Sequence, residues 1–257
     1  FRGAARPAPF AIGLILLWIA AETFPFVPTT DWQPLKDGLK PLLLEPAVQA
    51  RSMASHCLGW MAVAFLWRTR SGLARPGYGP WLALAGVLAA QVVIVEQTLT
   101  ASEILGGLAG VTLARLLPPG RLGAGVLAVL TMSLLVWDGL APFRWQEASA
   151  AFHWLPLHGF LQSSTFLALG VGLAKLFWYG LLAELLLAAT ARPGPSVGLG
   201  AGFLAAIEAA QRGISGHVAE ITDPLLFAAL VGIHIGLRRG PAQGLADQVG
   251  SQQPEGH

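Results

Sequence analysis

Eight apolar stretches dominate this chain, and the acidic residues near them gather at two of the turns between stretches. A membrane-spanning helix needs roughly 20 mostly apolar residues. Only 12% of the residues are charged, about half the fraction usual in soluble domains. We therefore expect an all-α, polytopic transmembrane helix bundle of about eight spans. The predicted spans cover residues 10–28, 52–68, 79–97, 101–117, 122–141, 162–190, 197–212 and 222–238.

Basic residues are distributed unevenly between the two sides that eight spans create. The termini and the connections on their side carry ten Arg residues, whereas the connections on the other side carry five Lys and Arg residues. Because loops rich in Lys and Arg stay cytoplasmic, we expect both termini in the cytoplasm. A seven-span count would place the Arg238–Arg239 pair outside and weaken this asymmetry.

The two longest connections lie on the side opposite to the termini in this topology. Residues 28–51 combine Leu with Lys and Asp, which is typical of a segment that lies in the membrane interface. Residues 141–160 contain Trp145 and Trp154, whose amphipathic rings suit the headgroup region.

The two halves of the chain look related. Each has an outer loop that begins with Pro and Phe, then a span, a basic turn, and a hairpin with carboxylates at its tip. We expect one four-span unit at 10–121 and a second at 122–239, repeated in parallel about an axis along the membrane normal. The alternative to a duplication is that apolar helices resemble one another by composition alone. Residues 1–9 would form an N-terminal cytoplasmic segment, and residues 240–257 a disordered polar tail.

Polar residues at the two hairpin tips are the candidate sites, because an ionisable residue at membrane depth is a candidate functional residue. Glu208 and Gln211 share one helix face, and Arg212 is the expected ionic partner of Glu208. The main candidate site comprises Glu208, Gln211, Arg212, His217, Glu220 and Asp223, and a secondary one comprises Glu96 and Glu103.

Several of these residues also have a plain structural explanation. Asp223 precedes Pro224 and an apolar run, which is the placement of a helix N-cap. Arg212 could be an ordinary interfacial residue, and His217 an exposed loop residue. Outside the hairpins, Glu22 and Glu184 lie deep in predicted spans and therefore need polar partners.

Several kinds of chemistry find no support in the motifs. The chain has no HExxH and no CxxC, so we expect no metal site and no cofactor. Its single cysteine, Cys57, permits no internal disulfide. The lack of a Walker-type loop and of GxSxG argues against ATP-driven transport and ordinary serine hydrolysis. The formal charge of +2 gives no indication of nucleic-acid binding.

Gly106, Gly107 and Gly110 predict a close helix–helix contact.

The second hairpin resembles the VanZ-like family of bacterial membrane proteins. Members of that family typically have Glu and Gln near the end of one span, Arg in a short turn, and Asp at the start of the next span. Glu208, Gln211, Arg212 and Asp223 match this order, and Phe227 stands where the family has Asn.

The first half resembles the same family less closely. Residues 55–66 are similar to its His-containing span, and Glu103, Gly107 and Gly110 stand where its Asp and small residues belong. Residues 175–186 are similar to the corresponding span of the second half. The resemblance therefore touches most of the chain.

The resemblance implies a multi-pass protein of the bacterial inner membrane that serves the cell envelope; some members of the family are associated with glycopeptide tolerance. We expect it to bind or act on a lipid-linked or other envelope component at the extracytoplasmic face, which leaves open whether it is an enzyme. The alternatives are a non-catalytic transmembrane subunit of a larger complex and a small secondary transporter. The expected partners are membrane lipids, a lipid-linked envelope precursor or other membrane-protein subunits, and no nucleic acid.

Overall fold

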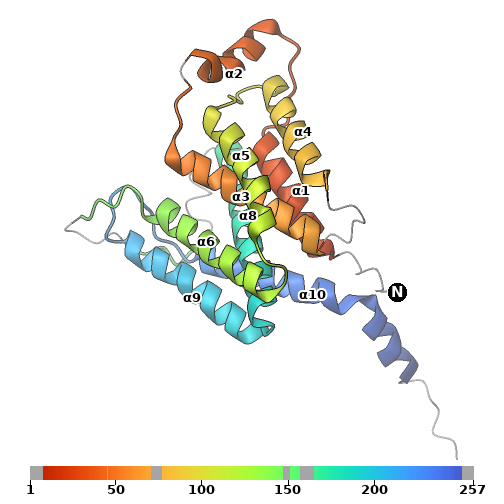
Figure 1. Cartoon of the computed structure of the whole chain (residues 1–257). Coiled ribbons are helices and arrows are strands. Elements are labelled where there is room, and N and C mark those ends of the chain that lie inside the picture. The colour runs from red at the N-terminus through yellow and green to blue at the C-terminus, as the bar shows by residue number, and fades with distance from the viewer. Residues whose placement is uncertain (1–7, 45, 71–76, 147–150, 157–164, 251–257) are drawn as a thin grey trace, which may run out of the picture.

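The computed structural model describes residues 8–44, 46–70, 77–146, 151–156 and 165–250, and over these residues the predicted all-α class is confirmed. The predicted N-terminal segment lies outside this part for its residues 1–7. Figure 1 shows α1 (Pro9–Thr23), α2 (Trp32–Leu44), α3 (Ala50–Arg70), α4 (Gly79–Val93), α5 (Ala101–Leu113), α6 (Arg121–Leu140), α8 (Thr165–Thr190), α9 (Pro193–Gln211) and α10 (Thr222–Gly250).

Prolines set the ends of several helices. Pro80 and Pro193 stand in the first turn of α4 and α9, where the missing N–H is not needed. Pro25 follows the end of α1, and Pro142 follows the end of α6, because a helix does not continue through a residue that precedes proline. Local sequence thus cuts α1 to 15 residues.

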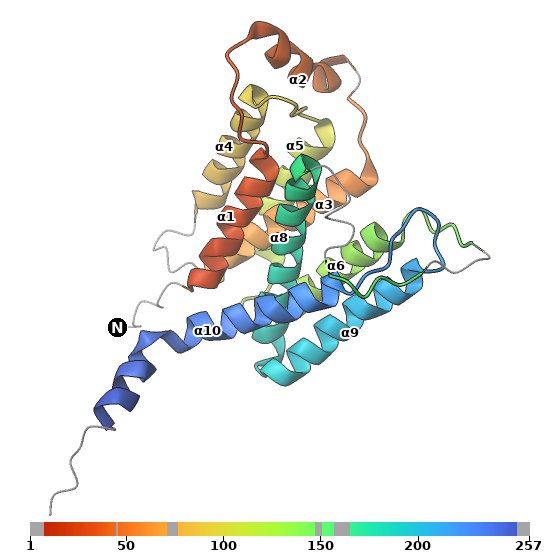
Figure 2. The same cartoon turned by 180° about the vertical axis from the view of Figure 1, so that it is seen from behind.

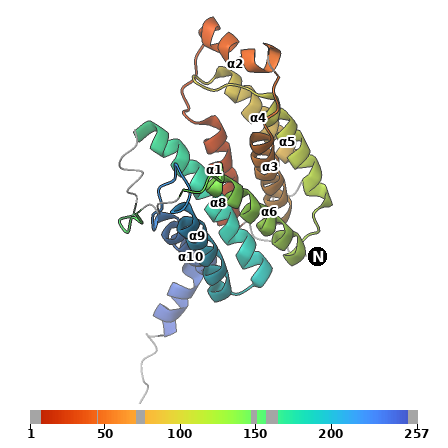
Figure 3. The same cartoon turned by 90° about the vertical axis from the view of Figure 1, so that its left-hand side faces the viewer.

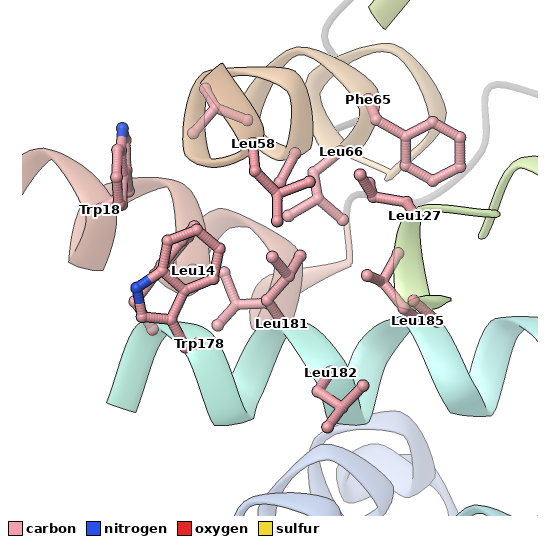
Figure 4. Packing of buried hydrophobic residues seen from close by; sticks show 14 of the residues in the cluster. Leu14, Trp18, Leu58, Phe65, Leu66, Leu127, Trp178, Leu181, Leu182 and Leu185 are labelled. Atoms are coloured by element: carbon pink, nitrogen blue, oxygen red, sulfur yellow. The ribbon is translucent and has the colours of Figure 1, made fainter. Parts of the chain in front are cut away.

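Helix α8 forms the centre of the bundle. It packs against α1, α6, α9 and α10, and Figure 3 shows it among them. Its residues from Phe177 to Leu187 are all buried. Figure 4 shows Leu181 and Leu185 facing side chains of neighbouring helices, among them Leu58 and Leu127. A helix that is apolar all round belongs in a core or in a membrane.

Glycines bring α5 against α3, as the sequence predicts. A Cβ atom on Gly106 would lie 2.6 Å from the Met53 carbonyl oxygen, and one on Gly110 would lie 2.2 Å from the Cys57 carbonyl oxygen. Both distances are shorter than a van der Waals contact, and the atoms concerned belong to the backbone of α3, which cannot move aside as a flexible side chain could. The small-residue face therefore permits a direct contact of two helix backbones.

Two helices extend beyond the bundle, at opposite ends of the molecule in Figure 2. One is α2, within the connection expected to lie in the membrane interface; its Trp32, Leu43 and Leu44 are exposed. The other is α10, which continues to Gly250. Residues 240–250 are therefore helical where the sequence predicted a disordered tail, and residues 251–257 lie outside the described part.

Among the described residues, two helices are long and apolar enough to cross a membrane by length and composition, Arg121–Leu140 and Phe166–Thr190. Two others, α1 and α4, are apolar but have only 15 residues. They are shorter than the windows 10–28 and 79–97 because the chain turns at Pro25 and after Val93. The count of eight spans therefore stays a prediction.

Gly110→Ala tests the contact of α3 with α5. We expect it to lower the free energy of unfolding by about 1–3 kcal/mol, because the new methyl group overlaps the Cys57 carbonyl. Gly125→Ala on α6 is the matched control, since a Cβ atom there meets nothing within 4 Å. Thermal unfolding of both variants in the same detergent gives the comparison, and equal melting temperatures would contradict the contact.

Candidate functional site

The chain leaves α1 and α6 in the same way. The Phe26 N–H donates to the Thr23 carbonyl at 2.9 Å, and the Phe143 N–H donates to the Leu140 carbonyl at 2.7 Å. Phe26 and Phe143 both have positive φ, at 64° and 59°. Each turn contains an X–Pro peptide bond that is cis, Phe24–Pro25 or Ala141–Pro142.

Each of these turns then pairs with the tip of a helical hairpin. Pro28 forms an isolated antiparallel bridge with Ile94, at the α4–α5 tip. Trp145 forms the same kind of bridge with Ile214, at the α9–α10 tip. Two backbone hydrogen bonds of 2.7–3.1 Å hold each pair. The two hairpins are therefore attached to the preceding helices by equivalent backbone contacts.

In the first half, two glutamine side chains cap the end of α1. The Gln91 Nε2 group donates to the Glu22 carbonyl at 3.2 Å, and the Gln97 Nε2 group donates to the Phe24 carbonyl. Carbonyl groups in the last turn of a helix have no partner within the helix. Gln91 and Gln97 therefore supply hydrogen-bond donors for these carbonyl groups from the hairpin.

The second half repeats this arrangement with hairpin residues that stand 120 positions later in the sequence. The Gln211 Nε2 group donates to the Gly139 carbonyl at 3.0 Å, and His217 Nε2 lies 2.7 Å from the Ala141 carbonyl oxygen. Ala141 precedes Pro142 as Phe24 precedes Pro25. Gln211 and His217, both predicted site residues, thus hold the hairpin in place.

A cavity of about 520 Å³ opens beside this second hairpin. Its walls come from α3, α6, α8, α9, the 217–220 turn and α10. Its volume is within the range of small-molecule sites, about 300–1,000 Å³. Five of the predicted site residues line it: Glu208, Gln211, His217, Glu220 and Asp223.

Asp223 is the centre of the polar wall. Its Oδ1 atom lies 2.6 Å from Lys175 Nζ, and its Oδ2 atom accepts a hydrogen bond from the Tyr179 hydroxyl. Lys175 and Tyr179 are one turn apart on α8 and so share one face. Asp223 lies in the first turn of α10, where a carboxylate is also favoured by the helix dipole.

Glu208 stands beside this group on α9. Its Oε2 atom accepts the Glu220 backbone N–H at 2.8 Å, and its side chain is buried, with 2% of the residue exposed. Two further lining residues form an ion pair that joins α3 to α6, with Arg51 Nε 2.6 Å from Asp138 Oδ1. The cavity therefore brings together acidic and basic side chains from both halves of the chain.

Arg212 is placed differently from the prediction. It follows the last residue of α9, is exposed, and is not among the described residues that line the cavity. Its backbone carbonyl accepts a hydrogen bond from the Gln146 side chain at 3.3 Å. Lys175 contacts Asp223 of the acidic cluster at 2.6 Å, because α8 packs against α10.

The two residues of the predicted secondary site, Glu96 and Glu103, lie in different surroundings. Glu96 lies exposed in the turn with φ of 64°. Glu103 forms a capping box with Thr100 at the start of α5, and its carboxylate lies 3.9 Å from His56. His56 also lies 3.4 Å from the Glu22 carboxylate, which supplies the partner that Glu22 was expected to need.

Sequence reasoning missed some residues that the structure brings to these sites. None of Lys175, Tyr179 and Asp138 is assigned to a site from the sequence alone. A signal for Tyr179 was its position four residues after Lys175. A further pair lies in the core, where His234 Nδ1 is 3.0 Å from Glu184 Oε2 and each residue is 1% exposed.

Comparison of the chain with models of protein families, with curated proteins and with solved structures gave no match. Among the described residues, no group of three or more His, Cys, Asp and Glu side chains has the geometry to hold a metal ion.

A double-mutant cycle on Lys175 and Asp223 tests the centre of the site. Each of Lys175→Met and Asp223→Asn should lower the free energy of unfolding by about 1–3 kcal/mol, because each removes a charged hydrogen-bond partner. The double variant should lose less than the sum of the two.

The Lys40–Asp37 pair on α2 is the control. Its side chains are 55% and 49% exposed, against 36% and 11% for Lys175 and Asp223, so solvent screening should make its coupling much the smaller of the two. Equal coupling in the two cycles would contradict this account.

Proposed function

We propose that this chain is a VanZ-like protein of the bacterial inner membrane that holds the polar headgroup of an amphiphile in the cavity beside the second hairpin, at the extracytoplasmic face. The observation that carries the proposal is the composition of the cavity walls. One side has Asp223, Lys175 and Glu208, and the remainder includes Leu135 and Leu204. Such a wall suits a ligand with one polar and one apolar end.

The apolar outer surface of the helices supports a membrane location. Large apolar side chains are exposed on α4, α6, α8 and α10, for example Leu82, Val129, Leu167 and Ile233. Soluble monomers rarely expose large contiguous apolar patches. Together with the two helices of sufficient length, this surface supports eight spans with lipids as their main partners. In this proposal the short helices α1 and α4 cross the membrane together with the turns that follow them.

The equivalent hairpin attachments support a duplicated four-helix unit, with copies at 10–121 and 122–239. Glu103 and Asp223 are 120 residues apart, as are Gln91 and Gln211. In each copy the acidic residue opens the last helix and lies beside a basic side chain of the second long helix, His56 or Lys175. In this proposal the first copy shapes the bundle and the second carries the ligand.

The single cysteine allows a test of the topology. Starting from Cys57→Ser, a cysteine placed at exposed Lys36 should react with a membrane-impermeant thiol reagent on cells whose inner membrane is intact. A cysteine at exposed Arg238 should react only after the membrane is opened, because the basic residues keep that end in the cytoplasm. Equal reactivity of the two positions on intact cells would contradict the proposed topology.

The headgroup site is tested by the lipids that stay bound to the protein. Val171 lines the cavity and is 56% exposed, so Val171→Trp should fill part of the cavity without disturbing the core. Leu169 on the same helix is 50% exposed and does not line the cavity, which makes Leu169→Trp the matched control. Native mass spectrometry after extraction in mild detergent should show a bound amphiphile on the parent and on Leu169→Trp, and much less on Val171→Trp.

Two results would count against this function. Equal amounts of amphiphile on all three proteins would mean that the lipid binds elsewhere on the apolar surface. A stoichiometric protein partner with no bound amphiphile would favour the alternative of a transmembrane subunit in a larger complex.

A further inference from the structure

We infer that the cavity takes an uncharged, hydroxyl-rich headgroup of the glycosyl kind, carried on an apolar chain. This inference rests on the function proposed above and names the class of its ligand. It follows from how the cavity is opened and from how the charges on its walls are arranged.

The first half has the same framework, but the corresponding space is filled. Trp18 and Glu22 stand seven and three residues before Pro25, and Leu135 and Gly139 stand at the same distances before Pro142. Trp18 is buried, and a Cβ atom on Gly59 would lie 2.3 Å from its ring. The Glu22 carboxylate reaches His56.

In the second half these two side chains are replaced by smaller ones, and both replacements border the cavity. Leu135 and Gly139 are among its lining residues. The cavity therefore lies where the matching half places a tryptophan ring and a carboxylate. Its position follows from two specific substitutions in a shared framework, which is the arrangement expected of a binding site that was opened for a ligand.

Lys175 and Arg51, the Lys and Arg side chains among the described residues that line the cavity, are both paired with acids. Lys175 Nζ lies 2.6 Å from Asp223, and Arg51 Nε lies 2.6 Å from Asp138. The walls also carry the carboxyl groups of Glu208 and Glu220. An anionic headgroup such as a phosphate would therefore meet the carboxylates of Asp223 and Asp138 beside each cation, at close range.

A cationic headgroup also finds few free acceptors, because Asp223 and Asp138 are each paired with a cation at 2.6 Å and Glu208 accepts the Glu220 backbone N–H. An ammonium group attracted by the carboxylates would also lie beside Lys175 and Arg51, whose charges repel it. A neutral polyol has no such conflict, because each hydroxyl both donates and accepts hydrogen bonds. It can donate to carboxylate oxygens and accept from the Lys175 and Arg51 nitrogens without adding a charge.

The aromatic residues of the wall suit the same class. Trp178 and Tyr179 are adjacent on α8 and both line the cavity. Their side chains present an apolar surface together with a polar group, which matches a ring that is apolar on its faces and carries hydroxyls at its edges. Leu204 and Ile207 continue the wall as apolar surface suited to an alkyl chain.

Three probes with the same alkyl chain separate the ligand classes: octyl glucoside, octyl phosphate and octylamine. Each is added below its micellar concentration to the full chain in phosphatidylcholine nanodiscs, and thermal unfolding is measured. We expect saturable stabilisation by octyl glucoside alone, with a rise in Tm of about 3–6 °C at ten times its apparent Kd. The rise should be lost in Val171→Trp and kept in Leu169→Trp.

The outcomes distinguish this inference from the function on which it rests. A larger saturable effect of octyl phosphate or octylamine that is lost in Val171→Trp would overturn the glycosyl class while supporting a headgroup site. No saturable effect of any probe, or an effect unchanged in Val171→Trp, would overturn both. Free glucose at the same concentrations tests the apolar chain, and a shift equal to that of octyl glucoside would overturn the requirement for it.

Discussion

The carbonyl groups at the ends of α1 and α6 are the constraint on which the rest of this structure depends. A helix that stops before proline leaves its last carbonyls without partners, and in apolar surroundings each unsatisfied group costs free energy. Gln91 and Gln97 meet this need at α1, and Gln211 and His217 lie at the corresponding carbonyls of α6. The same side chains tie each hairpin to its neighbour.

That attachment determines where the acidic residues lie. Because each hairpin tip is held against a preceding helix, the first turn of the following helix is held as well. Glu103 and Asp223 occupy that first turn, within reach of His56 and Lys175. The polar cluster is therefore a consequence of backbone satisfaction at the helix ends, and the central helix α8 supplies its basic and phenolic members.

The sequence predicted those parts of the site that depend on short-range geometry. Helical spacing put Glu208 and Gln211 on one face, and the Asp223–Pro224 pair indicated a helix start, which α10 confirms one residue earlier, at Thr222. The contacts of Gly106 and Gly110 followed from the spacing of small residues. In each case the relevant partners stand within a few residues or on one helix face.

The remaining features depend on how distant helices meet, which spacing does not reveal. Lys175 reaches Asp223 across 48 residues, and Arg51 reaches Asp138 across 87 residues. Hydropathy also overestimated the length of α1, because it does not register the turn at Pro25. Arg212 was the nearest cation along the chain, but it is exposed after the last residue of α9 and is not among the described residues that line the cavity.

Two positions that border the cavity of the second half carry larger side chains in the first half. Where the first half has Trp18 and Glu22, the second has Leu135 and Gly139, while Gln91 and Gln211 make the same kind of hydrogen bond in both. In evolutionary terms, the hydrogen bonds that maintain the fold are separate from the side chains that make the cavity. Lineages of such a protein could therefore close one cavity, open the other or reshape its walls by a few substitutions, without rebuilding the scaffold.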